Sequence, residues 1–565
     1  MRSRKSFAAA AALVSVTTIL PAAAYAQLNV CSWARDVKLV NGKILTMDPK
    51  NSIVNEVTIQ DGKFVAIGKV ANQKLNTCTK ILDVKGRTVV PGLIDNHNHF
   101  ISLGLRPGYD VRLETAWSIP EIQERIRQRI KTIPPGAFVT GTAGWSIKQL
   151  PEKRVPNMAE LDEAAPNNPV FIYPTGAGGA VSNTLAKKFF DEKGVKITPM
   201  GTLAEGGTIS DAIGALRTIQ TFEDEKRGMM DAEAYSVSLG LTVNVDQGFN
   251  FLRNTPDMQD SAAGPPGIET FSPWTFYDAA LALDRENKLT ARLRIFHYAV
   301  DTNMDVPIIR QRLLNNFPNF GNDMLNAAGV GERVVASPPR PPGERGGNAG
   351  GPLRPENEEA GLQVVAKQGW AYSEHSTTLA SDMEITRIFE RVNETTPIAN
   401  LHWSLGHVNH IDLATLNRLK ALGAGVEPHG WSYLNGSGPA AGPPFRLIID
   451  SGIHAGGGSD SVGVTALDPW LMIYYMVTGK NSAGEVINEG QQITRMEALR
   501  LYTADNGWFF REENKLGSME PGKLGDLVVL SADYTDANKV PDQDIRNLKS
   551  VLTVVGGKVV YDNMH

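Results

Sequence analysis

The chain has 565 residues, of which 21% are charged, and its formal net charge is −5 at pH 7. This length accommodates one large domain of ~250 residues or more and a smaller companion. The acidic balance offers no basic surface for nucleic acid, and after the first residues no segment approaches ~18 uninterrupted apolar residues. We therefore expect neither nucleic acid nor a membrane as a partner.

Residues 1–26 have the three-part pattern of a secretory signal peptide. Basic residues between Arg2 and Lys5 precede an apolar stretch from Phe7 to Leu20, and Ala24-Tyr25-Ala26 provides a small-x-small cleavage pattern. The apolar stretch is too short and wrongly flanked for a membrane anchor. We expect an exported protein, periplasmic or secreted, and we exclude this segment from the fold.

The two cysteines, Cys31 and Cys78, lie near the start of the mature chain and lack the paired spacing of a zinc knuckle. In an exported protein they can form one disulfide that ties the first residues to a later strand. Two free thiols are the alternative, and neither cysteine is assigned a catalytic role.

Short β segments separated by turn signals predict a β region near each end of the chain. Asn-Gly or Asp-Gly between apolar runs is a strong hairpin signal. Asn41-Gly42 joins residues 37–40 to 43–46, and Asp61-Gly62 joins 57–60 to 64–67. Similar segments return at 526–530, 551–555 and 558–561. We predict one small β-sandwich domain built from both termini, residues 27–90 and 513–565.

Residues 91–512 alternate apolar strand candidates with helical patterns, which indicates parallel β/α architecture. We predict the α/β class and a (β/α)8 TIM-like barrel with insertions. The eight candidate strands end at or near His99, Asp246, Tyr298, Val335, His375, His407, His429 and Asp460. Residues 100–240 form a long excursion with extra strands at 137–140 and 169–173. The proline- and glycine-rich residues 337–361 are predicted to form a mobile loop, either covering the active face or without a role.

His97 and His99 end the apolar run that begins at Val89. Side chains on a strand alternate faces, so both imidazoles leave the same face. One strand end can thus supply two ligands to one metal ion. The alternative is a pair of ordinary solvated or core histidines, and the strand context favours the metal site.

His375, His407 and Asp460 end three later strands of the predicted barrel. Reactive residues of such barrels gather at the carboxyl ends of the strands. Together with His97 and His99 they form a set of nitrogen and oxygen donors typical of a divalent metal, with zinc expected. Such an ion lowers the pKa of a bound water from 15.7 to ~7, and Asp460 could accept the proton of that water and return it to the leaving group.

Further residues near the strand ends are assigned more loosely. His429, Trp145 and Trp431 are candidates for lining a substrate pocket, with ordinary packing as the alternative. His402, His410 and His454 do not fit the strand-end pattern and are assigned structural roles; among them His410 is the best rival of His407.

These motifs resemble those of the amidohydrolase superfamily, in particular its N-substituted formamide deformylase-like branch. The resemblance covers nearly the whole mature chain and depends on residues 91–99, 458–460, 498–503 and 517–526. It implies a metal-dependent hydrolase whose ligands are His97, His99, His375, His407 and Asp460.

Three positions depart from that family pattern. One is Gly178, which stands where the branch often carries a histidine. The branch usually carries a lysine on strand four that can bridge two metals as a carbamate, and the closest alignment places Arg333 there. Arginine cannot form this bridge, so one ion is favoured over two, unless a shifted register lets Glu332 substitute. Gly406 replaces the acidic residue that usually precedes the sixth-strand histidine.

We predict an exported metal-dependent hydrolase that cleaves a C–N bond of a small amide, formamide or cyclic amide, with Asp460 as proton shuttle. Ester or lactone hydrolysis at the same site is the close alternative. The departures at Arg333 and Gly406 also leave open a catalytically degenerate binding or regulatory protein. The sequence does not decide whether the protein forms a homo-oligomer.

Overall fold

The computed structural model describes residues 31, 34–248, 275, 277–299, 301, 304–335, 355–438 and 441–564. The signal peptide predicted for residues 1–26 and the part of the predicted loop at 337–354 lie outside these residues. Within the described ranges, no helix combines the length and apolar character needed to cross a bilayer.

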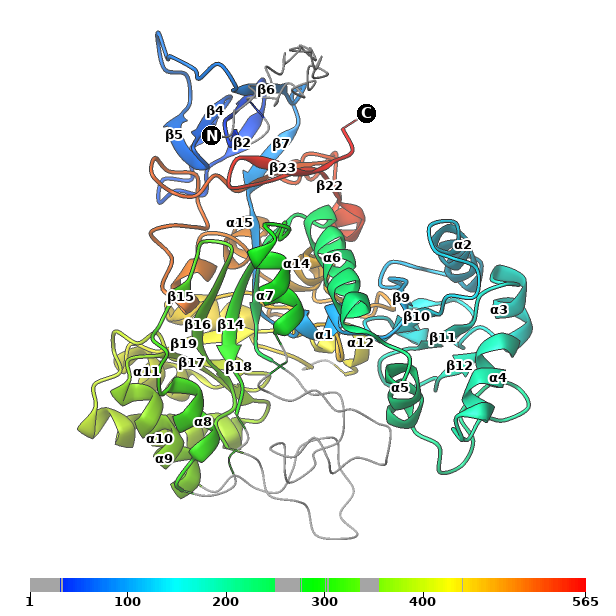
Figure 1. The fold of residues 1–565 in the computed structure, drawn as a ribbon. Helices are drawn as coiled ribbons and strands as arrows, with labels where there is room; N and C mark the ends of the chain where they lie inside the picture. The colour runs from blue at the N-terminus through cyan, green and yellow to red at the C-terminus, as the bar shows by residue number, and fades with distance from the viewer. Residues whose placement is uncertain are drawn as a thin grey trace, which may run out of the picture.

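Eight parallel strands form a curled sheet at the centre of the molecule (Figure 1). They are β8 (Leu93–Asn98), β13 (Leu241–Asp246), β14 (Arg292–His297), β16 (Leu325–Glu332), β17 (Ala371–Ser376), β18 (Ser404–His407), β19 (Gly425–Pro428) and β20 (His454–Ala455). A short strand, β15 (Phe320–Gly321), pairs antiparallel with β16. The parallel half-barrel is consistent with a TIM-like barrel, and seven predicted strands end within three residues of their observed ends.

The eighth strand differs from its prediction, because β20 ends at Ala455 and not at Asp460. The glycines at 456–458 pass close to neighbouring side chains, and a Cβ on Gly456 would collide with the ring of Phe509. This segment still joins the sheet edge: the Asn96 N–H donates to the Gly457 carbonyl at 3.2 Å, and the Asp460 N–H donates to the His97 carbonyl at 2.9 Å. These bonds bring the last strand region against the first.

Helices alternate with the strands and pack on the sheet through a large hydrophobic cluster. They are α1 (Phe100–Gly104), α6 (Phe222–Ser238), α7 (Asp278–Arg285), α8 (Pro307–Leu313), α9 (Pro355–Lys367), α10 (Leu379–Thr395), α11 (Leu413–Ala421), α12 (Ser432–Asn435), α13 (Phe445–Ser451), α14 (Pro469–Thr478) and α15 (Arg495–Leu501). The described residues also form 3₁₀ segments: η1 (Ile147–Gln149), which lies between β10 and α3, and η2 (Asn506–Phe510) and η3 (Asp542–Asn547).

Part of the predicted loop is wrong, because residues 355–361 belong to helix α9. Pro355 and the acidic Glu356 and Glu358 look like loop residues, but proline in the first turn and carboxylates near a helix N-terminus also favour helix initiation. Leu362 and Val365 then bury the apolar side of the helix.

A separate four-stranded sheet with its own helices follows α1 and lies beside the curled sheet (Figure 1). Its elements are β9 (Tyr109–Asp110), β10 (Val139–Thr142), β11 (Val170–Tyr173), β12 (Val181–Ser182), α2 (Ile119–Ile130), α3 (Met158–Ala164), α4 (Thr184–Glu192) and α5 (Ile209–Arg217). β10 and β11 confirm the two extra strands predicted in the excursion. We call these elements the inserted unit.

Strands from the two ends of the chain form two further sheets. One has the order β5-β4-β1-β6 and the other β23-β22-β21-β7-β2-β3, so that the second combines both ends of the chain. The strands are β1 (Val37–Val40), β2 (Lys43–Leu45), β3 (Ile53–Val54), β4 (Val57–Gln60), β5 (Lys63–Ile67), β6 (Lys80–Asp83), β7 (Thr88–Pro91), β21 (Leu527–Leu530), β22 (Ser550–Val555) and β23 (Lys558–Asp562). The β-sandwich domain and its boundaries remain predictions.

One of the two predicted hairpins is wrong. β4 and β5 pair around Asp61-Gly62, whereas β1 and β2 belong to different sheets. A two-residue type I′ turn needs positive φ at both central residues. Asp61 and Gly62 meet this condition with φ of 49° and 77°, while in the other turn only Asn41 does, with φ of 57°.

A disulfide joins Cys31 to Cys78. The pairing confirms the predicted bond and ties the first described residue to the segment before β6.

Candidate metal centre

The five predicted ligands converge where the strands of the curled sheet end. His97 lies on β8, His99 directly follows it, His375 lies on β17 and His407 ends β18. Asp460 follows β20 and is held against β8 by its backbone bond to His97. All are buried except His375, whose side chain is 23% exposed.

Two groups of donors share this space. In the first group, His99 Nε2 lies 3.1 Å from Asp460 Oδ1, and His97 Nε2 lies 3.9 Å from the same oxygen. In the second, His375 Nδ1 lies 2.8 Å from His407 Nε2. His407 Nδ1 is 3.5 Å from Asp460 Oδ2, so the Asp460 carboxylate lies between the two groups.

Glu332, the last residue of β16, supplies a second carboxylate at the centre. Its Oε2 atom lies 2.8 Å from His375 Nδ1, 3.3 Å from His407 Nε2 and 3.5 Å from His97 Nε2. Its Oε1 atom lies 3.8 Å from His99 Nε2. The alternative register considered from the sequence is thus the observed one, and Glu332, not Arg333, faces the histidines.

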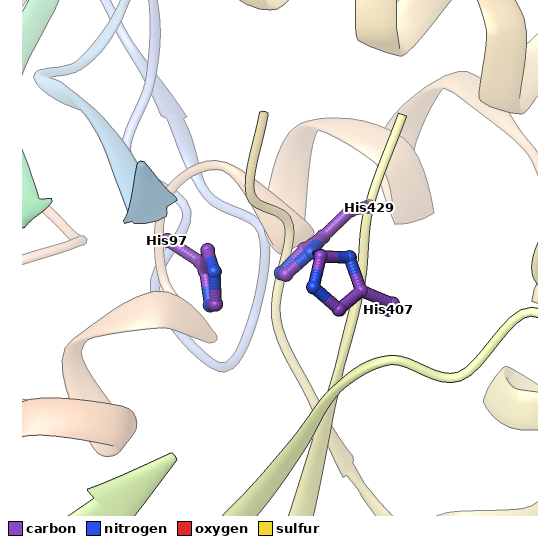
Figure 2. Close-up of side chains that lie close together, drawn as sticks. All are labelled: His97, His407 and His429. Carbon is purple, nitrogen blue, oxygen red and sulfur yellow. The ribbon is translucent and has the colours of Figure 1, made fainter. Parts of the chain in front are cut away.

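His429 lies directly after β19 and is fully buried against two of the predicted ligands. Figure 2 shows its ring beside that of His407, with His97 facing both. Its Nδ1 atom is 3.0 Å from His407 Nδ1, and its ring centroid is 4.1 Å from that of His97. His97, His407 and His429 form a third set of donors close enough to share an ion.

Glu427 was not predicted as a site residue from the sequence. It lies on β19 beneath the histidines, and its Oε2 atom is 3.0 Å from His97 Nδ1. The hydroxyls of Ser373 and Ser404 donate to the same carboxylate. A carboxylate on the second ring nitrogen fixes the orientation of a metal-binding histidine and increases its basicity. The signal available in the sequence was its spacing of two from His429, which places both side chains on one face of the strand.

The backbone around Asp460 is fixed by a second buried carboxylate, that of Asp95 on β8. The Ser459 N–H donates to Asp95 Oδ1 at 2.9 Å, and the Ser459 hydroxyl donates to Asp95 Oδ2 at 2.5 Å. Asp460 itself has a left-handed φ of 57°. Asp95 therefore connects β8 to the turn that aims Asp460 at the histidines.

The charges of the centre are strongly coupled. Burial lowers the pKa of His97, but the nearby carboxylates of Glu332 and Glu427 outweigh burial and raise it to about 10. Burial acts to raise the pKa of Glu332, yet His375, His407 and His97 hold it well below its usual value. Burial lowers the pKa of His375 to about 4 and that of His429 well below its usual value.

The donor set fits a divalent cation. Ring nitrogens approach one another at 2.8 Å between His375 and His407 and at 3.0 Å between His407 and His429. The Nε2 atoms of His97 and His429 are buried without a hydrogen-bond partner. Imidazole nitrogens and carboxylate oxygens converging in this way are the ligands that zinc and related ions take.

The other predicted site residues lie in three different settings. The Trp431 ring centroid is 5.5 Å from that of His407, at the edge of the centre. Trp145 is fully buried in the hydrophobic cluster of the inserted unit, and His429 is fully buried within the centre; their role in lining a substrate pocket stays a prediction. His410 is exposed, and His402 and His454 stack on either face of Trp508.

A family model for the amidohydrolase family matches residues 80–259 and 353–561. The chain belongs to the amidohydrolase family. It is accordingly a hydrolase of the amidohydrolase type, a class that acts on C–N bonds other than peptide bonds. All four predicted histidine ligands lie within the two matched stretches, as do Asp460, His429, Glu427 and Asp95, and Glu332 lies between the stretches.

Individual proteins are similar to this chain to different extents. An N-substituted formamide deformylase of Arthrobacter pascens is 32% identical over 155 residues, which cover 27% of this chain and 28% of that protein. Protein LONG AFTER FAR-RED 3 of Arabidopsis thaliana is 23% identical over 93% of this chain and 91% of its own length.

Among solved structures, a mutant of the atrazine chlorohydrolase TrzN from Arthrobacter aurescens TC1, complexed with zinc and atraton, has a TM-score of 0.55. It is 16% identical and covers 94% of this chain and 96% of its own. This likeness concerns the fold.

Proposed function

We propose that this amidohydrolase is an exported, metal-dependent enzyme that hydrolyses the C–N bond of a small amide, formamide or cyclic amide. The observation that carries the proposal is the convergence of His97, His99, His375, His407 and Asp460 around the carboxylate of Glu332. The histidines come from the ends of three strands, and Asp460 comes from the turn after β20. Zinc is the proposed ion, because nitrogen-rich mixed donor sets favour it and because the zinc-complexed TrzN has a related fold.

We propose two ions per chain, in place of the single ion favoured from the sequence. The single-ion expectation depended on Arg333 occupying the bridging position. Glu332 instead has one oxygen 3.8 Å from His99 Nε2 and the other 2.8 Å from His375 Nδ1. A carboxylate in that position could supply one oxygen to an ion held by the His99 group and the other oxygen to an ion held by the His375 group.

The residues of the chain divide the catalytic work between them. When bound, the ion polarises the scissile carbonyl and lowers the pKa of the attacking water. Asp460 lies between His99 and His407, where it can take the proton of the attacking water and return it to the leaving nitrogen. Glu427 orients His97, and Asp95 holds the turn that presents Asp460.

Elemental analysis of the purified mature protein, followed by an assay panel, tests this proposal. We expect about two zinc ions per chain and turnover of N-acyl amines, N-substituted formamides or cyclic amides. Glu332→Gln should reduce the metal content, because a neutral amide is a poor bridging ligand. One ion in the native protein and an unchanged content in Glu332→Gln would contradict the bridging role.

The same panel should include lactones and simple esters, because the site chemistry does not exclude them. Turnover of lactones alone would replace the C–N proposal with the ester alternative. A protein without metal and without turnover would support the degenerate binding protein instead.

The geometry gives two reasons to favour an enzyme over a degenerate binder. Glu332 supplies the carboxylate that the Arg333 alignment lacked. A Cβ on Gly406 would lie 3.3 Å from His97 Cε1 and 3.4 Å from His429 Cε1, so His429 occupies the space that a larger side chain would need. The departures at Arg333 and Gly406 thus each have a local explanation.

A further inference from the structure

The inserted unit supplies none of the donors that the described residues bring together at the metal centre. It contacts instead residues 461–468, which begin directly after Asp460 and form neither a helix nor a strand. Such a segment lacks the hydrogen bonds of a helix or a sheet, so its buried backbone groups need partners from elsewhere. Those partners determine where the segment lies.

Two buried side chains at the edge of the inserted unit bind the backbone of this segment. Arg106, between α1 and β9, donates through Nη2 to the Val462 carbonyl at 2.6 Å. Thr175, two residues after β11, donates to the Gly463 carbonyl at 3.2 Å. The Thr175 hydroxyl also accepts from the Gly144 N–H at 2.9 Å. This second bond leaves the hydroxyl proton directed at the segment.

These contacts lie directly after a residue whose backbone conformation is disfavoured. Asp460 has a φ of 57°, in the left-handed region that a residue with a side chain keeps only where its surroundings impose it. On the N-terminal side, Ser459 is bound to the Asp95 carboxylate. On the C-terminal side, the carbonyls of residues 462 and 463 are bound by the inserted unit. The turn that carries Asp460 is thus held from both sides.

We propose that Thr175 and Arg106 are positioning residues for Asp460, so that the inserted unit affects the rate of the reaction without supplying a metal ligand. The two side chains fix the backbone two and three residues after Asp460. The inference rests on the proposed function, because it takes Asp460 as the proton shuttle. Misplacing a reacting group by about 1 Å can cost roughly 100-fold in rate, so a small movement of this segment should lower kcat.

Thr175→Val tests the proposal, because valine has the shape of threonine and lacks only the hydroxyl. On the substrate that the assay panel identifies, we expect kcat to fall roughly tenfold and KM to change less than about twofold, because the lost bond acts on the reacting group and not on substrate binding. Thr175→Ser retains the hydroxyl and should keep kcat within a factor of about two. A native kcat in Thr175→Val would overturn the proposal.

Thr140→Val is the matched control for a loss of stability in the inserted unit. The Thr140 hydroxyl, on β10, is also buried and also donates to a backbone carbonyl, that of Pro107 at 2.9 Å. This bond does not involve residues 461–468. We expect both valine variants to have similar thermal unfolding temperatures, and only Thr175→Val to have a lower kcat. A similar loss of kcat in both would show a general effect of the inserted unit and overturn the positioning role.

Hydrogen exchange of the full-length protein provides a readout that does not need turnover. The backbone amides of residues 461–468 should exchange faster in Thr175→Val than in Thr140→Val, because local opening of the segment becomes easier. Equal exchange in the two variants would contradict the proposal. Arg106→Gln removes the bond to Val462 and should produce the same faster exchange and lower kcat. Where Arg106→Gln does not fold, Thr175→Val decides the question.

Asp460→Asn separates a failure of this inference from a failure of the proposed function. If Asp460→Asn is inactive and Thr175→Val has the native kcat, the positioning role is wrong and the proposed function stands. If Asp460→Asn keeps native turnover, the proposed function loses its proton shuttle, and the inference is refuted with it.

Discussion

The two ends of the central sheet hold buried charges in opposite ways. Where β14 begins, Arg292 donates to both carboxylate oxygens of Asp526 at 2.7 and 2.8 Å, and Arg294 Nε donates to Glu512 at 2.7 Å. Where the strands end, ring nitrogens of His375 and His407 face each other at 2.8 Å. At the first end each arginine meets a carboxylate, whereas at the second end imidazoles also face one another beside their carboxylates.

This difference implies that the arginine pairs stabilise the fold, whereas the histidine cluster provides the residues for activity. The arginine pairs are complete within the protein and connect the sheet to the C-terminal segment that carries Glu512 and Asp526. The histidines and their carboxylates form an arrangement that a cation completes. Changes at the two ends should therefore have different readouts, one in activity and metal content and the other in stability.

The largest expected effect is the loss of activity at the histidine end. His375→Ala should lower kcat/KM roughly 1000-fold or more, because an ion that supplies several kcal/mol of transition-state stabilisation loses a ligand. Asp460→Asn should also abolish turnover, but it should keep part of the metal because four histidines and Glu332 remain. Steady-state kinetics and elemental analysis measure the two effects.

Thermal unfolding provides the control for these two variants. The side chain of His375 is partly exposed, so its truncation should leave the fold largely intact. Normal turnover in His375→Ala would refute its role as a ligand, and normal turnover in Asp460→Asn would remove Asp460 as the proton shuttle.

At the opposite end of the sheet, the expected effect is on stability. Glu512→Gln removes the charge that compensates Arg294, which is fully buried. Breaking a buried pair by removing one partner costs about 3–5 kcal/mol, because the remaining charge is left uncompensated. Chemical denaturation should show this loss in the free energy of unfolding, while kcat/KM of the folded enzyme stays within a factor of about two.

Glu390→Gln is the matched surface control. Glu390 receives two hydrogen bonds from Arg418, at 2.8 and 2.7 Å, but both side chains are about a third exposed or more. An exposed pair contributes about 0–1 kcal/mol. If Glu512→Gln cost no more than Glu390→Gln, the arginine end would not be the stabilising end that the comparison requires.

The sequence allowed most of the centre to be predicted, because its signals are local. His97 and His99 are two apart at the end of an apolar run, and His375, His407 and Asp460 were each placed at the end of a predicted strand. Glu332 remained an alternative because a one-residue shift in a strand exchanges its two faces. No nearby motif fixes the register of β16.

The wrong predictions about the fold also arose where one sequence pattern is compatible with two local structures. Asn-Gly indicates a hairpin, but the turn conformation decides whether the chain reverses, and Asn41 and Gly42 do not both adopt positive φ. Pro355 and the acidic residues after it indicate either a loop or a helix start. Such choices depend on packing between distant segments, which local patterns do not contain.

Asp468 is a third buried charged group, and its environment differs from both the arginine pairs and the histidine cluster. Asp468 caps α14 by accepting from the Trp470 N–H at 2.9 Å, and its own N–H donates to Glu114 at 3.2 Å. Burial and the nearby Glu114 raise the pKa of Asp468 to about 7. The Asp468 carboxyl lies near the Glu114 carboxylate, and a proton on Asp468 removes the repulsion between the two charges.

The native state therefore holds a proton on Asp468 at pH values where the unfolded chain, with its pKa of 3.8, has released it. The free energy of unfolding should fall as the pH rises from about 4 to 7. The Asp468→Asn variant cannot ionise at this position, and asparagine remains a good helix cap. The variant should therefore be roughly 1–2 kcal/mol more stable than the native protein at pH 8 and no more stable at pH 4.

Asp412→Asn, the same change at the cap of α11, is the control. Backbone hydrogen bonds lower the pKa of Asp412, so this variant should gain no stability at pH 8. Equal pH profiles for the native protein and Asp468→Asn, measured by denaturant unfolding, would show that this buried carboxylate is as fully compensated as those of Asp526 and Glu512.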